Sequence, residues 1–303
     1  MKKISSFLIF ILLIGTFLSP IVFADGKDDN DDVIDELHGK PVLVLGEALS
    51  EAQRNQVRES LNATNADQVE EYIVTGQDLQ NFIGGNPNSN MYSSAKVTHK
   101  DAGHGVVVEV VTPENITQVT REMYANALLT AGVENALVEV ASPLRVTGHS
   151  ALVGIYKAFN VDGESLDQDR MEVANQELNV VTELAEEEGI SADEVTELLT
   201  EIKKAISELD PATREEIEQI INDQLERLNL QLTQEHRDML VDLFDRMRNL
   251  NIDFGQVTQQ LESIVGDLRE RLGGITNADT EGLWNGIKNF FQSIASWFSG
   301  LFD

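Results

Sequence analysis

The sequence contains no cysteine, and this absence excludes several kinds of chemistry at once. Without thiols there is no structural disulfide, no thiol nucleophile and no cysteine-ligated metal. The lipid anchor of a bacterial lipoprotein is excluded for the same reason. Any catalysis must therefore use other side chains.

Positive charge is also scarce, because 22 Lys and Arg stand against 52 Asp and Glu, for a net charge of -30. Loss of Lys2 and Lys3 with a cleaved leader would bring the charge to -32. Such a surface disfavours nucleic acid as a partner and opposes unaided docking on an anionic membrane or wall polymer. We interpret the acidic surplus as a solubility adaptation to salty or alkaline surroundings. A specific cation-binding role is the alternative.

The first 24 residues have the features of a signal peptide. Lys2 and Lys3 precede an apolar run from 7 to 17, and Val22-Phe23-Ala24 ends in a small residue suited to a signal peptidase. We predict export with cleavage after Ala24, to an extracellular, wall-associated or membrane-associated location. An uncleaved membrane anchor is the alternative, because residues 4–24 are just long enough to span a bilayer.

Residues 25–39 form an acidic segment with little to bury, so we predict a flexible linker. Beyond it, residues 40–162 combine short β-branched runs with capped helical segments. Strands are expected at 41–46, 69–75, 92–99, 106–112 and 136–141. Gly103 predicts a hairpin between the third and fourth strands, and Thr112-Pro113 predicts the start of a helix. From Val69 this order matches the split βαβ pattern of ferredoxin-like folds, so the predicted class is α+β with a mixed sheet.

Residues 163–279 lose the strand signal and are predicted to form a helical bundle that is separable from the first domain. Capping residues open successive amphipathic segments at Ser191, Asp210, Thr233 and Asp253. Residues 280–303 then predict one amphipathic helix with an aromatic stripe. The stripe includes Trp284, Phe291, Trp297 and Phe298. We expect it to pack against the protein's own helices, with a membrane surface or a groove on a partner protein as the alternatives.

Few residues suggest a reaction. The five histidines lack the spacing of a metal-binding helix pair, and no pattern indicates a phosphate cradle or a nucleophile elbow. We therefore predict no catalytic residue, no metal and no cofactor. Two groups are candidate ligand-binding residues, the first as a polar stripe on a predicted helix and the second as a polar loop or helix cap. They are Thr117, Thr120 and Tyr124, and then Thr147, Gly148, His149 and Ser150.

Two blocks in the centre of the chain carry a family resemblance. They are NITQVTREMYANALLTAGVENALVEVASP at 115–143 and VTGHSALVGIYKAF at 146–159. With them the chain resembles the uncharacterised bacterial family called domain of unknown function 1002, or YpuA-like. The resemblance implies an exported protein of Gram-positive bacteria and supplies no activity. It also implies an acidic residue at the position of His149.

Together these observations predict an exported, non-enzymatic protein of the cell envelope that acts as a binding or regulatory module. An envelope protein or a wall component is the expected partner, and a membrane surface is a further contact open to the C-terminal helix. The alternative is a secreted hydrolase acting on cell-wall polymers. That reading needs two carboxylates facing a groove, usually with aromatic residues for sugar stacking, and the first domain has few aromatics.

Overall fold

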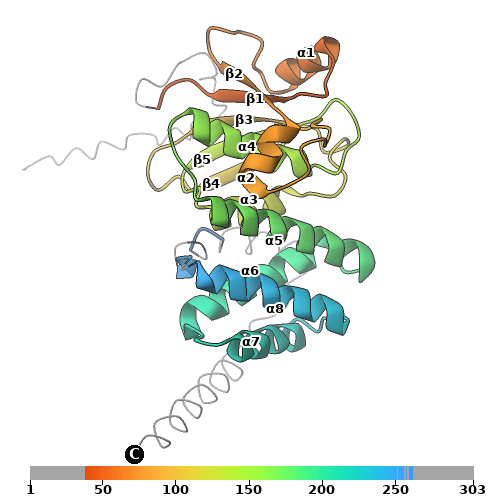
Figure 1. Ribbon diagram of the computed structural model, residues 1–303, viewed down its shortest axis with the longest axis vertical. Coiled ribbons are helices and arrows are strands. Elements are labelled where there is room, and N and C mark those ends of the chain that lie inside the picture. Colours follow the sequence, from red (N-terminus) through yellow and green to blue (C-terminus); the bar gives the residue numbers. More distant parts are fainter. Residues whose placement is uncertain (1–37, 251, 256, 258, 262–303) are drawn as a thin grey trace, which may run out of the picture. The chain divides into compact units, whose positions relative to one another are not determined.

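The computed structural model describes residues 38–250, 252–255, 257 and 259–261 (Figure 1). The predicted leader at 1–24, the linker up to residue 37 and the aromatic helix at 280–303 lie outside these residues. Trp284, Phe291, Trp297 and Phe298 belong to that last segment. Within the described part of the chain, no helix is both long and apolar enough to cross a membrane.

A five-stranded mixed sheet lies at the centre of the first part of the chain (Figure 1). Its strands are β1 (Val42–Gly46), β2 (Glu70–Val74), β3 (Ser94–His99), β4 (Val106–Val110) and β5 (Ala136–Ala141). Their order across the sheet is β2-β1-β3-β5-β4. β1 pairs parallel with β2, and β4 pairs parallel with β5, whereas β3 runs antiparallel to both β1 and β5.

Strand β1 is buried on both faces, which explains its uninterrupted apolar sequence. Val42 and Val44 point into the main hydrophobic core. Leu43 and Leu45 point the other way, into a smaller cluster with Val57. Val57 belongs to helix α1 (Glu51–Ser60), so α1 covers the second face of the sheet.

Three helices build the main core on the first face. They are α2 (Gly76–Ile83), α3 (Arg121–Ala131) and α4 (His149–Val161). α4 packs against β1, β2 and β3, and α3 packs against β4. Both helices bury most of their residues, because each is covered by the sheet on one side and by further helices on the other.

Four helices follow in the second part of the chain. They are α5 (Gln168–Glu187), α6 (Ala192–Leu209), α7 (Arg214–Arg227) and α8 (Gln234–Asn249). α5 packs against α2 and α3, and one hydrophobic cluster continues from β1 to α8. The domain boundary at residue 162 stays a prediction, and these contacts mean that the helices after it share their core with the sheet domain.

A buried charge joins the two parts. The Lys203 ammonium on α6 is 0% exposed and lies 2.6 Å from Glu177 Oε1 on α5. It also donates to Thr130 Oγ1 at 2.9 Å and to Asn126 Oδ1 at 3.1 Å, both on α3. Thr130 Oγ1 in turn donates to Glu177 Oε2 at 2.6 Å. Burial lowers the pKa of Lys203, and the charge and hydrogen bond of Glu177 offset this effect only in part. The bonds tie α3 to α5 and α6.

The α+β class and two of the predicted helix starts are confirmed. Ser191 and Thr233 cap α6 and α8, and each side-chain oxygen accepts a backbone N–H of the first turn. Ser50 caps α1 in the same way. The predicted hairpin between β3 and β4 is wrong, because β5 lies between these strands. The glycine turn exists, but Gly103 and Gly105 donate their backbone N–H groups to Asn135 Oδ1 instead of closing a hairpin. The sheet order therefore differs from a ferredoxin-like one.

Two predicted helix starts are wrong. α3 begins at Arg121 with Thr120 as its cap, not at Thr112-Pro113, because residues before it pair with a distant segment. Asp210 ends α6 in a left-handed conformation with φ of 46°, and α7 begins only at Arg214, where the Thr213 side chain caps it.

Candidate functional site

The segments that hold the two groups of candidate residues lie against each other. Ile116 forms an isolated parallel bridge with Val146. Thr117 donates to the Val146 carbonyl oxygen through both its backbone N–H and its hydroxyl, each at 2.9 Å. The residues before α3 therefore hold the residues before α4 in place.

Tyr124 and Gly148 make the most buried contact between these segments. The Tyr124 side chain is fully buried, and its hydroxyl donates to the Gly148 carbonyl oxygen at 2.6 Å. Burial raises the pKa of the Tyr124 phenol, so the phenol stays a donor. Gly148 has φ of 109°, and a Cβ atom there would lie 2.7 Å from the Tyr124 hydroxyl. This position requires glycine both for its backbone and for its space.

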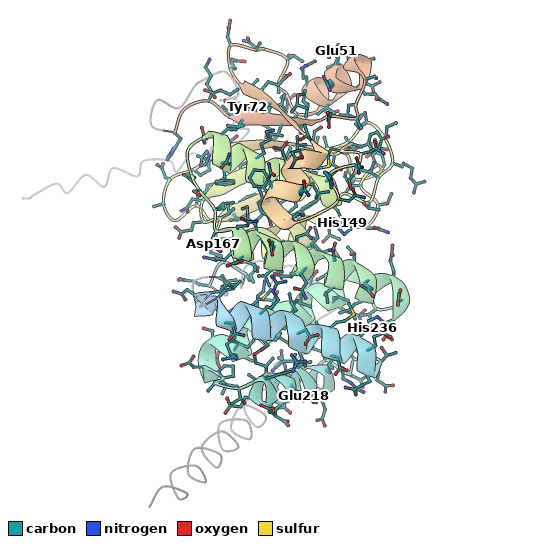
Figure 2. The ribbon with its side chains drawn as sticks, viewed as in Figure 1. Glu51, Tyr72, His149, Asp167, Glu218 and His236 are labelled. Atoms are coloured by element: carbon teal, nitrogen blue, oxygen red, sulfur yellow. The ribbon has the colours of Figure 1, made fainter. Side chains whose placement is uncertain are left out.

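The contact positions the wall of a pocket of about 360 Å³ at the start of α4. Figure 2 labels His149 at this end of the helix. The lining residues are Leu79, Ser89, Asn90, Met91, Tyr92, Val146, Thr147, Gly148, His149, Ser150 and Asn175. All four candidates from 147–150 line it. Thr117, Thr120 and Tyr124 do not line it, but Thr117 bonds to Val146 and Tyr124 bonds to Gly148, which are both lining residues.

Thr117, Thr120 and Tyr124 do not form the single helix face that the sequence predicts. Thr117 is exposed and precedes the helix. Thr120 accepts the Met123 backbone N–H at 3.2 Å as the cap of α3. Tyr124 lies wholly in the core.

The pocket is lined by neutral groups. None of its lining residues is a carboxylate, a lysine or an arginine. Burial lowers the pKa of His149 below its ordinary value, and the charge of Glu186 opposes this effect only in part. His149 Nε2 lies 3.3 Å from the Thr182 hydroxyl on α5. At neutral pH the ring is therefore uncharged, and the pocket offers hydroxyl, amide and imidazole groups for hydrogen bonds.

His149 and Ser150 are not arranged as a base and a nucleophile. The imidazole contacts Thr182, and Ser150 Oγ accepts the Ser93 backbone N–H at 3.2 Å. A hydrolytic pair would need the imidazole within hydrogen-bond reach of the hydroxyl that it activates. The pocket also lacks the paired carboxylates of glycoside hydrolysis. Its geometry suits binding.

Sequence reasoning missed the rest of the lining. Ser89, Asn90 and Tyr92 come from the loop before β3, and Asn175 comes from α5. Asn175 reaches this pocket because α5 packs against α2 and α4, and the loop before β3 brings the other three. No local pattern marks them.

A second pocket of about 510 Å³ lies beside the glycine turn. Residues 102–107, Glu134, Asn135, Gln259 and Gln260 line it. It contains none of the predicted candidates, and much of its wall is the turn itself. The pocket at α4 is the stronger site.

The fold and this site define an α+β protein with a pocket lined by uncharged residues, whose core continues into a helical bundle. The chain belongs to the family described as protein of unknown function (DUF1002), whose model matches residues 45–264. It is similar to a Bacillus subtilis (strain 168) protein named "Uncharacterized protein YpuA", with 32% identity over 272 residues and 88% of each chain covered. A model of the TMP repeat matches residues 284–294, which lie outside the described residues. No solved structure matches.

Proposed function

We propose that the protein is exported to the cell envelope and binds a neutral saccharide component of the wall in the pocket at the start of α4, without catalysis. The observation that carries this proposal is a pocket of about 360 Å³ with no charged lining residue, in which hydroxyl and amide groups stand among apolar side chains. Small-molecule sites commonly have volumes of about 300–1,000 Å³. The pocket is therefore large enough for one or two sugar rings.

The lining favours sugars over other small molecules. Asn90 and Asn175 supply amide groups, Thr147 and Ser150 supply hydroxyls, and Tyr92 supplies an aromatic ring. These groups match the hydroxyl and acetamido groups of a neutral sugar. The net charge of -30 would repel an anionic ligand.

Export rests on the leader at 1–24. Protein recovered from the culture medium or the wall fraction should begin at Asp25 by N-terminal sequencing. A membrane-bound species that begins at Met1 would support the uncleaved anchor instead.

Binding is tested by calorimetry of the mature protein with an N-acetylglucosamine trimer, a neutral acetamido sugar. Asn175→Leu removes an amide from the pocket wall and should weaken binding by about tenfold or more. Asn179→Leu is the matched control, because Asn179 is exposed on the same helix one turn further on. Equal affinity of both variants and the wild type would refute the pocket as the site.

The same samples test for catalysis. The trimer should be recovered intact by mass spectrometry after prolonged incubation with the mature protein. Its cleavage would favour the alternative of a secreted hydrolase.

A further inference from the structure

The end of α5 meets the start of α8 at His236, which Figure 2 labels. The His236 side chain is only 7% exposed. Its Nδ1 atom lies 2.5 Å from Glu188 Oε1, and also 3.0 Å from the Thr233 hydroxyl. The Nδ1 side of the ring is therefore hydrogen-bonded within the protein.

The other side of the ring faces two carboxylates. Nε2 lies 3.5 Å from Glu187 Oε2 and 4.0 Å from Glu183 Oε1, both longer than an ordinary hydrogen bond. Glu183 and Glu187 stand one turn apart on α5, so both project toward the ring. One ligand atom from each of the three residues lies within 4.8 Å of the other two.

This spacing is close to that of a metal site. Zinc bonds of 2.0–2.1 Å in a tetrahedron place neighbouring ligand atoms about 3.3 Å apart. Nε2 therefore needs to close by about 0.2 Å on Glu187 and about 0.7 Å on Glu183, and the two carboxylates by at most about 1.5 Å on each other. Glu183 and Glu187 are 43% and 63% exposed, so their side chains are free to make that adjustment.

The hydrogen bond at Nδ1 explains why Nε2 is available. A carboxylate that accepts the Nδ1 proton leaves the Nε2 lone pair pointing outward, which is the usual support of a metal-bound histidine. The hydrogen bond to Glu188 and the charges of Glu187 and Glu183 raise the pKa of His236, so a proton and a metal ion compete for Nε2. A metal ion that displaces this proton gains Nε2 and two carboxylate oxygens as ligands.

The negative charge at the end of α5 also favours a bound cation. Glu183, Glu187 and Glu188 lie in the last two turns of α5 and its cap, where the helix dipole disfavours negative charge. That last turn has no basic residue. In the described part of the chain, neither Glu183 nor Glu187 forms an ion pair with a lysine or arginine. Their charge is left for another cation to neutralise.

We propose that Glu183, Glu187 and His236 bind a divalent transition-metal ion, Zn²⁺ in the first place, with Glu188 as the positioning residue. This inference goes beyond the sugar-binding function and does not depend on it. The imidazole favours Zn²⁺ over Mg²⁺ and Ca²⁺, which prefer all-oxygen sites. Bound metal would fasten the end of α5 to the start of α8. The spacing of histidines along the sequence does not reveal such a site, because its ligands come from two helices.

The test is calorimetry of the full mature chain with Zn²⁺. We expect one tight site in the wild type, and an affinity lower by about tenfold or more in Glu187→Gln and in His236→Gln. Glu188→Gln should weaken binding by about 10–100-fold through the lost support of the ring. Glu186→Gln is the matched control, because it removes one charge from the same helix turn outside the cluster and should leave the affinity unchanged.

Thermal unfolding shows whether each variant is folded, so that weak zinc binding is not mistaken for loss of structure. Glu187 is exposed, so Glu187→Gln should melt like the wild type without metal. Zn²⁺ should then raise the melting temperature of the wild type and of Glu186→Gln, but not that of Glu187→Gln. Equal zinc binding by wild type and Glu187→Gln would overturn the proposal in favour of diffuse attraction to an acidic surface. So would the absence of binding at about 1 mM Zn²⁺.

Discussion

The hydroxyl of Tyr124 donates a hydrogen bond of 2.6 Å to the carbonyl oxygen of Gly148. Tyr124 lies in the first turn of α3, and Gly148 is the N-cap of α4. The bond therefore links the starts of two core helices that follow separate strands. It also fixes the backbone from which Thr147, His149 and Ser150 line the pocket.

Tyr124→Phe should lower both stability and sugar affinity. The substitution leaves the Gly148 carbonyl without its donor in the core, at a cost of about 1–3 kcal/mol. Urea unfolding measures this loss. Thr117→Val is the control, because Thr117 is exposed and its loss should cost less. Unchanged stability of Tyr124→Phe would show that the contact does not hold the two helices.

Gly148→Ala should be more costly than Gly103→Ala. Both glycines have positive φ, of 109° and 93°, so both substitutions strain the backbone by about 1–3 kcal/mol. A Cβ atom at 148 also meets the Tyr124 hydroxyl and Ile116 Cγ2 within 3 Å, whereas one at 103 meets nothing within 4 Å. The difference between the two unfolding free energies measures the cost of the Cβ contacts at position 148. Equal losses of stability would contradict a close approach there.

Acid should destabilise the protein in part through His149. Burial lowers the pKa of His149 in the folded state below its ordinary value of 6.5, so the unfolded chain takes up this proton first as the pH falls. Stability from this ring is complete well above pH 6.5 and declines as the pH falls through that value. His149→Gln should show a smaller loss than the wild type between about pH 7.5 and pH 5.5. The same loss in both proteins would mean that the ring already titrates normally.

Lys203→Met should destabilise the protein strongly. It leaves Glu177, which is 1% exposed, as an unpaired charge in the core, and breaking such a pair costs about 3–5 kcal/mol. Lys204→Met, at the neighbouring part-buried position, should cost less. The double substitution Lys203→Met with Glu177→Met should recover much of the loss, because it leaves no charge unpaired.

The Lys203→Met variant also tests the boundary near residue 162. In the wild type, the Lys203–Glu177 ion pair joins α6 to α5, and the other bonds of Lys203 reach α3. If the sheet and the bundle share one core, the near-ultraviolet and far-ultraviolet circular dichroism signals should disappear in one transition. Two separate transitions would support the separable halves that the sequence predicts.

Local signals predicted much of the fold. Apolar, alternating or β-branched runs bounded by turns marked the strands, and cap residues such as Ser191 and Thr233 marked helix starts, because both depend on neighbours along the chain. Strand pairing was not predictable in this way. β5 inserts between β3 and β4, and Ile116 pairs with Val146, through contacts that no local pattern encodes.

Only the part of the candidate site that is continuous in sequence was predicted. Residues 147–150 stood out as a polar cluster at a turn, and they line the pocket. Asn175 and Asn90 were missed because only tertiary packing brings them there. Lys203 was missed because a lysine on an amphipathic helix normally lies in solvent, and only Glu177 and Thr130 make its burial tolerable.

The pocket at the start of α4 is tested most directly by mapping amide chemical shifts of the isotope-labelled mature protein during titration with the N-acetylglucosamine trimer. The account predicts shifts concentrated at residues 89–92, 146–150 and 175, which line the pocket. Shifts confined to other surfaces, or none at about 10 mM trimer, would contradict it.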